Sequence, residues 1–326
     1  LDAQHKALAT SSKYDSWQKA ELAAQAVESL SKVVKESYDF YFDFDPSFTW
    51  WMPTPWGKLD AGMKSYAKAL RAHYTNSVKD DGSGIIGKPI GREALEKQLA
   101  FEMIAYTPEE LIAEAEKQFA WCEKEMLKAS NELGFGNDWK AALEMVKNTY
   151  LPAGAWPQEV VRLGDEAIDL MVKNDWLTVP PLAIETWRTS MISAERQRVS
   201  PFFLGGEVIQ IAYPTSEMSH EDKMMSMRGN NPHFSRATVQ HELIPGHHLQ
   251  QFMNQRHLIH RRPFGTPFWT EGWALYWEFV LWDRQFPRDA KDKVGMLFWR
   301  MHRAARIIFS LNYHLGKMTP QQCIDL

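Results

Sequence analysis

The sequence predicts a mainly α-helical fold with a small β-sheet. Apolar residues recur at helical spacing along most of the 326 residues, whereas only two short segments have the pattern of strands. Apolar residues make up 44% of the chain and charged residues 24%, which is typical of a globular protein with a substantial core and excludes a disordered chain.

Four segments show the apolar spacing of amphipathic helices. The first places Leu22, Ala26 and Leu30 on one face. Another opens with Thr107, Pro108 and two glutamates, which is typical of a capped helix start because the acids lie at the positive end of the helix. The sequence therefore predicts helices over residues 15–37, 91–105, 108–133 and 157–174.

Strand signals are few. Aromatic residues occupy every second position of residues 38–44, and residues 208–213 (VIQIAY) are rich in strand-forming side chains. Both are predicted strands, and the second is a candidate edge strand with which a substrate backbone could pair. Residues 45–62 hold three prolines, and residues 216–236 are rich in methionine and asparagine, so both are predicted loops.

Charge and composition exclude several classes of partner. Thirty-seven basic and 41 acidic residues give a net charge of −4, which does not favour nucleic acid. No stretch reaches the roughly 18 consecutive apolar residues of a membrane span. Cys122 and Cys323 are too few and too far apart for a disulfide framework. We expect a soluble protein, either cytoplasmic or exported after removal of an N-terminal segment, and the compartment stays open.

The segment HELIPGHHLQ, residues 241–250, concentrates histidines beside a glutamate. In the usual His-Glu-x-x-His motif, two imidazoles four residues apart on a helix bind one zinc ion. Here His247 and His248 follow His241 by six and seven residues, which on a regular helix is about 240° round the axis or about 10.5 Å along it. We expect a local bulge at the intervening proline and glycine to bring His247 into place, with His248 as the alternative ligand.

The segment WTEGWALYWE supplies a candidate third ligand. Glu271 lies 24 residues beyond His247, enough for a loop and a returning helix, and the small residues after it should let that helix pack closely. Glu278 lies on the same helical face as Glu271 and is either a hydrogen-bond partner of a ligand histidine or an alternative ligand. The predicted site holds one Zn²⁺ per chain on His241, His247 and Glu271.

This pattern is typical of zincin metallopeptidases, in which the glutamate after the first histidine is the general base. Glu242 has that role here. We therefore predict a zincin-like helical fold with an active-site cleft. The predicted organisation is a mostly helical region over residues 1–180 and a metal-binding catalytic region over residues 181–326, with one continuous domain as the alternative.

Three sequence blocks carry a resemblance to a known family. HELIPGHHLQ, WTEGWALYWE and WRMHRAARIIFSLNYHLGKMTPQQ resemble the blocks of domain of unknown function 885, which is grouped with gluzincin-type metallopeptidases. The resemblance covers residues 90–326, and EGWA is similar to the third-ligand block of aminopeptidase-type gluzincins. Relatives include a prolyl-dipeptidyl carboxypeptidase, so the resemblance implies peptide hydrolysis, with a carboxypeptidase or dipeptidyl carboxypeptidase as the expected type.

The resemblance also bears on the end of the chain. Such families continue beyond the HLGKMTPQQ block into a segment with a tyrosine near the site, whereas this chain ends at Leu326. We expect an incomplete C-terminal region, which a second chain is a candidate to complete.

Residues near the C-terminus are candidates for the remaining roles. Tyr313 and His314 are candidate donors to the oxyanion of a tetrahedral intermediate. Arg303 and Arg306, three residues apart on a helix face, are candidates to clamp a substrate carboxylate.

Three functions follow, in order of preference. The first is a zinc peptidase acting on a peptide substrate. The second is a metal-dependent hydrolase of another amide or ester. The third is a non-catalytic binding protein with a zincin fold, which the presence of Glu242 disfavours.

Overall fold

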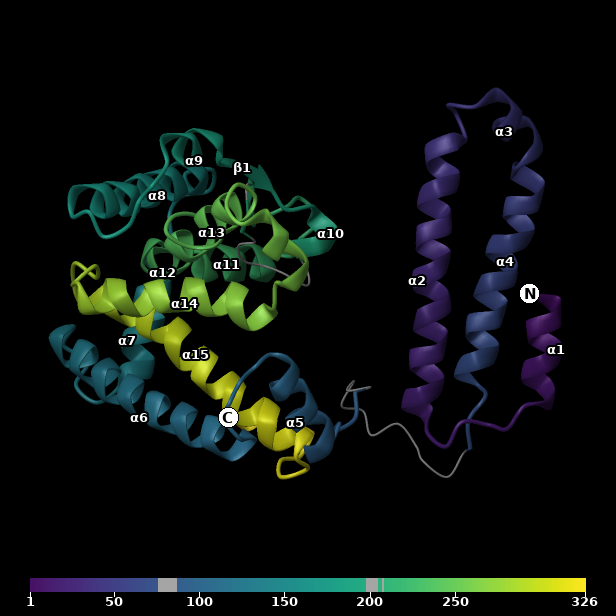
Figure 1. The fold of residues 1–326 in the computed structure, drawn as a ribbon, viewed down its shortest axis with the longest axis horizontal. Helices are drawn as coiled ribbons and strands as arrows, with labels where there is room; N and C mark the ends of the chain where they lie inside the picture. Colours follow the sequence, from purple (N-terminus) through teal and green to yellow (C-terminus); the bar gives the residue numbers. More distant parts are fainter. Residues whose placement is uncertain (76–86, 198–204, 207) are drawn as a thin grey trace. The chain divides into compact units, whose positions relative to one another are not determined.

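The structure is a computed structural model that describes residues 1–75, 87–197, 205–206 and 208–326. Helices dominate it, and the sheet found among these residues has two strands (Figure 1). The predicted mainly α fold with a small sheet is therefore confirmed. Within the same ranges, no helix combines the length and the apolar composition needed to cross a bilayer.

The chain divides into two compact units, one formed by residues 1–91 with 313–326 and the other by residues 92–312. The predicted boundary at residue 180 does not fall between these units. The reason is that α8 (Trp156–Lys173) and α12 (Pro232–Glu242), from either side of residue 180, share one hydrophobic core within the second unit.

The first unit contains a long helical hairpin, in which α2 (Trp17–Tyr41) packs against α4 (Pro53–Arg71) (Figure 1). Ala24, Ala67 and Leu70 form the centre of their contact. The small side chains of Ala24 and Ala67 let the two helices approach closely at this point. The other helices of this unit are α1 (Asp2–Thr10), α3 (Pro46–Trp51) and α16 (Pro320–Asp325).

Two predictions in this unit are wrong. The predicted strand over residues 38–44 lies largely in the last turns of α2, where the Tyr38 ring stacks on Trp56 at 4.8 Å. The predicted loop over residues 45–62 forms α3 and most of α4. Its prolines are compatible with helix because Pro46 and Pro53 each occupy the first helical position, where no backbone N–H is needed.

The second unit is packed around α12 (Pro232–Glu242), whose residues from Phe234 to His241 are all buried. Phe234 packs with α6 and α15, Ala237 with α8 and α14, and Val239 with α8 and strand β2. A helix that contacts protein on every side is held firmly along its length.

The unit comprises α5 (Arg92–Phe101), α6 (Pro108–Glu132), α7 (Trp139–Lys147), α8 (Trp156–Lys173), α9 (Pro181–Thr186), β1 (Arg188–Met191), α10 (Ala194–Gln197), β2 (Val208–Ile211), α11 (His220–Gly229), α12, α13 (His247–Asn254), the 3₁₀ helix η1 (Ile259–Phe264), α14 (Pro267–Asp283) and most of α15 (Ala290–His314).

The helices predicted around residues 108–133 and 157–174 are confirmed as α6 and α8, and α6 begins with the expected Thr107 cap. The strand predicted over residues 208–213 is confirmed as β2, which pairs in parallel with β1. The loop predicted over residues 216–236 is wrong. It contains α11 and the start of α12, because Asn231 caps the first turn of α12 by accepting hydrogen bonds from two backbone N–H groups.

A buried ionic network fixes α15 to α12. Asp292 is fully buried and accepts hydrogen bonds from His233 Nδ1 at 2.7 Å and from Arg288 Nε at 2.8 Å. Arg236 Nε lies 3.3 Å from Oδ2, the oxygen that also accepts from Arg288. Burial alone would raise the pKa of Asp292, but these partners outweigh it and hold the pKa well below its usual value. The backbones also touch here, since a Cβ on Gly295 would lie 2.2 Å from the carbonyl oxygen of His233.

Replacing Asp292 with asparagine should lower the free energy of unfolding by about 1–3 kcal/mol near neutral pH, because it weakens the buried hydrogen bond from His233 and removes one of the two carboxylates beside Arg236, which keeps its ion pair with Glu166. Folding lowers the pKa of this carboxyl, so its contribution is complete above about pH 4 and is lost as the pH falls further. Urea unfolding of both proteins from neutral to acid pH measures this, and the difference between them should shrink toward acid.

The matched control for this substitution is Glu93→Gln, because the Glu93 side chain is 84% exposed beside Lys97. It should change the free energy of unfolding by less than about 0.5 kcal/mol. Equal stability of wild type and Asp292→Asn at neutral pH would contradict the proposed role of the network.

Candidate metal centre

Two helices and a tight turn bring the predicted histidines together. Helix α12 ends at Glu242, and α13 begins at His247 after a turn that contains a cis Ile244–Pro245 peptide. The backbone N–H of Gly246 donates to the carbonyl of Gln240 at 2.9 Å, which folds the turn back on α12. The expectation of a bulge within one continuous helix is therefore wrong. The chain instead breaks one helix and starts another.

The turn requires glycine at its last position. A Cβ on Gly246 would lie 1.8 Å from the carbonyl oxygen of His241 and 2.5 Å from that of Gln240. Trp273 Nε1, on α14, donates to the carbonyl of Pro245 at 2.8 Å and ties the turn to the next helix. As a result the rings of His241 and His247 lie with centroids 4.7 Å apart and nearly perpendicular planes.

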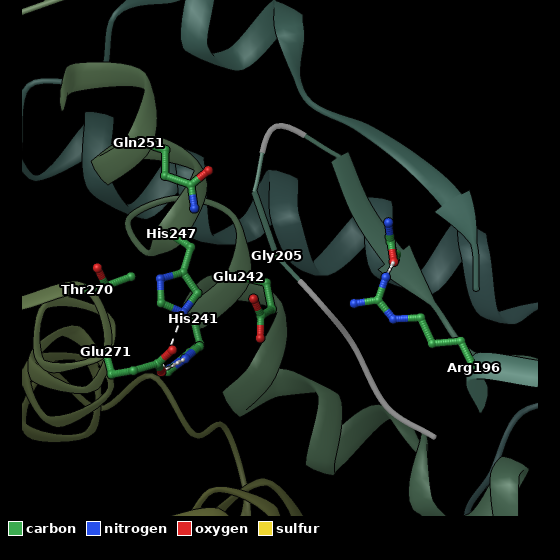
Figure 2. Close-up of a pocket in the computed structure, with 9 residues that line it drawn as sticks. Arg196, Gly205, His241, Glu242, His247, Gln251, Thr270 and Glu271 are labelled. Carbon is green, nitrogen blue, oxygen red and sulfur yellow. Dashed lines mark hydrogen bonds and ion pairs between the residues drawn. The ribbon is translucent and has the colours of Figure 1, made fainter. Parts of the chain in front are cut away.

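Glu271 joins these two imidazoles from the first turns of α14, which Thr266 caps. Its Oε2 lies 3.5 Å from His241 Nε2 and 3.6 Å from His247 Nε2 (Figure 2). The three side chains each offer one ligand atom within 4.8 Å of the others. The structure therefore brings together the three residues predicted as metal ligands.

The spacing and the donor types fit zinc. Two atoms bound tetrahedrally at about 2.0–2.1 Å from Zn²⁺ lie about 3.4 Å apart, close to the separations between Glu271 and the two imidazoles. A charge-assisted hydrogen bond between the same groups would be shorter, about 2.7–2.9 Å. Two imidazoles and one carboxylate, with a fourth position left for water, are also a known catalytic zinc ligand set.

The glutamates around His241 favour a positive charge at the centre of the cluster. Burial alone would lower the pKa of His241, but its contacts with Glu271 and Glu278 outweigh burial and raise the pKa to about 9. Contacts with His241 and His247 hold the pKa of Glu271 well below its usual range. The carboxylate thus stays ionised and available to a cation.

The two alternative ligands point elsewhere. His248 Nε2 donates to the carbonyl of Ala183 at 2.7 Å, away from the cluster. Glu278 accepts from His241 Nδ1 at 2.6 Å, on the opposite side of the ring from Nε2. The preferred set of His241, His247 and Glu271 therefore agrees with the geometry better than either alternative.

A second group of possible ligands among the described residues is His233 with Asp289 and Asp292. Arg288 and Arg236 already balance the charge of Asp292 there. The group therefore has no need of a metal ion.

A pocket of about 340 Å³ opens over the cluster. Glu242, the predicted general base, lines it and lies beside Gly205, where a Cβ would come within 2.0 Å of Glu242 Oε2 (Figure 2). Burial raises the pKa of Glu242, which makes the carboxylate a stronger base than an exposed one. The other wall includes Gln210 of β2, so the predicted edge strand does border the pocket.

Four lining residues were not predicted from the sequence: Arg196, Gly205, Gln251 and Thr270. Gln251 had a signal, because it lies four residues after His247 on the same helical face, and Thr270 directly precedes Glu271. Arg196 and Gly205 had none, since they lie far from the motif in sequence.

Four predicted residues lie outside the pocket lining. Arg303 donates to Glu278 Oε1 at 2.8 Å, so it binds a neighbour of the cluster instead of facing a substrate, and Arg306 is exposed. Tyr313 and His314 belong to the first unit, where the Tyr313 hydroxyl donates to the Gly87 carbonyl and the His314 Nδ1 accepts from the Ile90 N–H.

The family model described as "Bacterial protein of unknown function (DUF885)" matches residues 54–326. The chain belongs to the DUF885 family. Among solved structures, this DUF885 chain is similar to one titled "The structure of a putative lipoprotein of unknown function from Shewanella oneidensis", with a TM-score of 0.73 and 17% sequence identity. The match covers 94% of this chain and 59% of that protein, and it supports the fold. No curated protein matches the chain.

Substituting alanine for Gly246 should disrupt the cluster of His241, His247 and Glu271, because the added methyl group overlaps the backbone of α12. We expect a loss of about 1–3 kcal/mol or more in the free energy of unfolding, and weaker zinc binding because His247 must move away from His241. Thermal unfolding and zinc titration measure the two effects.

Gly272→Ala is the matched control, since a Cβ at this helical position meets nothing within 4 Å. It should be neutral or stabilising by up to about 1 kcal/mol. The open space around Gly272 also shows that this glycine is not needed for close helix packing, contrary to the sequence-based expectation. Equal behaviour of the two variants would contradict the steric account of the turn.

Proposed function

We propose that this chain is a zinc-dependent peptidase with one Zn²⁺ held by His241, His247 and Glu271. The observation that carries the proposal is the spacing of Glu271 Oε2 at 3.5 and 3.6 Å from the two imidazole nitrogens, beside a further carboxylate in an open pocket. When bound there, zinc would act as a Lewis acid and lower the pKa of a water molecule in its open position to about 7.

The chain's own residues would carry the proton transfers. Glu242 lies in the pocket lining and is the candidate to take a proton from the attacking water and deliver it to the leaving amine. Its partial burial and the close approach of Gly205 limit the water around it, which favours proton transfer within the site. Gln251 offers an amide group at the pocket wall for holding a substrate carbonyl, whereas the Thr270 hydroxyl already donates to the carbonyl of Thr266.

A peptide is the preferred substrate because strand β2 borders the pocket through Gln210 and offers backbone groups to an extended chain. Cleavage near the C-terminus, as in a carboxypeptidase or dipeptidyl carboxypeptidase, is the mode that the sequence resemblance implies. Arg196 replaces Arg303 and Arg306 as the candidate to bind a substrate carboxylate, because it lines the pocket.

Two other functions compete with this one. A metal-dependent hydrolase of another amide or ester would use the same groups. A zinc-binding protein without catalysis would use the cluster alone. Hydrolysis of a mixed peptide library, read by mass spectrometry, separates the peptidase from the other two and reports which end of each peptide is cleaved; a panel of ester and non-peptide amide substrates then separates those two.

Metal binding should depend on His247 and not on His248. Wild type should contain about one zinc per chain, His247→Ala should lose most of it, and His248→Ala should keep it, because the ring of His248 is bound to Ala183. Metal analysis of the folded proteins decides this. Loss of zinc in His248→Ala alone would overturn the ligand assignment.

Glu242→Gln should keep zinc but lower the rate of peptide hydrolysis at least about 100-fold, since the amide cannot accept the proton. Zinc content and initial rates measure the two properties. The control is Glu221→Gln, an exposed glutamate of α11 outside the pocket lining, which should match wild type in both. Full activity in Glu242→Gln would contradict its role as the base.

A further inference from the structure

We infer that Arg303 is a positioning residue for metal binding, which acts through Glu278 to hold the ring of His241 in its ligating orientation. The inference rests on the proposed zinc site. It replaces the sequence-based expectation that this arginine binds substrate.

One carboxylate oxygen joins the three side chains. Glu278 Oε1 lies 2.6 Å from His241 Nδ1 and 2.8 Å from Arg303 Nη2. Because an ionised carboxylate only accepts hydrogen bonds, the 2.6 Å contact places a proton on His241 Nδ1, and the 3.4 Å approach of Arg303 Nη2 to the same nitrogen is then a contact between two donors and not a hydrogen bond. Nε2, the atom that faces Glu271, is then the nitrogen that would give up its proton to a metal ion. The bond to Glu278 thus selects both the tautomer and the orientation that a metal needs.

Glu278 depends on Arg303 for its charge balance. Its side chain is 5% exposed, and burial of a carboxylate is costly unless the charge is paired. Arg303 supplies a permanent positive charge from α15, while His241 donates a hydrogen bond from α12. Without the arginine, the carboxylate loses its charge partner and the support for the rotamer that faces His241.

Arg303 is itself held in place. Its guanidinium lies 5.9 Å from the centre of the Trp299 ring, and Nη1 donates to the Trp299 carbonyl at 3.4 Å. Trp299 Nε1 in turn donates to the carbonyl of Phe234 on α12. Arg303 is therefore connected through Trp299 to α12, the helix that carries His241.

The two imidazoles of the cluster differ in this support. His247 Nδ1 is buried and has no hydrogen-bond partner within the described part of the chain. His241 is the imidazole whose orientation a charged pair determines. Zinc affinity should therefore be sensitive to Arg303, although it lies behind His241 and outside the pocket lining.

A double-mutant cycle on zinc affinity tests this inference. Zinc dissociation constants would be measured by competition with a chromophoric chelator for wild type, Arg303→Met, Glu278→Gln and the double variant. Each single change should weaken zinc binding about 10–100-fold, the usual effect of losing a group that orients a ligand. The double variant should be no weaker than Glu278→Gln alone, because the arginine acts through the carboxylate.

A second readout separates positioning from general stability. The visible spectrum of the Co²⁺-substituted protein reports the geometry at the metal, and Arg303→Met should change it. Arg306→Met, an exposed arginine on the same helix, should leave both zinc affinity and this spectrum unchanged. Should Arg303→Met fail to fold, Arg303→Lys keeps the charge but loses the forked donor, and it should still bind zinc more weakly than wild type.

Three results have distinct meanings. Unchanged zinc affinity in the Arg303 variants would overturn the inference and leave the zinc site intact. Multiplicative losses in the double variant would overturn it too, since Arg303 would then act independently of Glu278. A wild-type chain that binds no zinc would overturn the proposed function, and the inference with it.

Discussion

The site depends on how closely the turn after α12 packs against that helix. The N–H of Gly246 bonds to the carbonyl of Gln240, and no side chain fits between the turn and the carbonyl of His241. This contact converts a spacing of six residues, which would separate two side chains on a regular helix, into a pair of facing imidazoles. Without it, Glu271 would meet one imidazole and the fit to a metal ion would disappear.

The rest of the second unit holds this arrangement in place. Helix α12 is buried on all sides and α15 crosses it at Gly295, where the backbones are in contact. Helix α14 contributes both Glu271, which faces the cluster, and Glu278, which bonds the far side of the His241 ring. Because α12, α13 and α14 each supply one side chain of the cluster, its geometry depends on the packing of these helices and not on one motif.

The sequence predicted which side chains lie together better than it predicted the local conformation. The cluster of His241, His247 and Glu271 could be predicted because the residue types required for zinc are few and lie in two short segments. The break between α12 and α13 could not, since a proline–glycine pair is compatible with both a bulge and a new helix. The same ambiguity made the prolines of residues 45–62 indicate a loop where they begin helices. Arg196 could not be found either, because only tertiary folding brings it to the pocket.

The most direct test of the account is the location of zinc in crystals of the chain grown with the metal. An anomalous difference map should show one strong peak about 2.0–2.1 Å from His241 Nε2, His247 Nε2 and a Glu271 oxygen, with Glu242 beside the open position. Density in which these three side chains diverge, or a peak bound by His248 in place of His247, would contradict it.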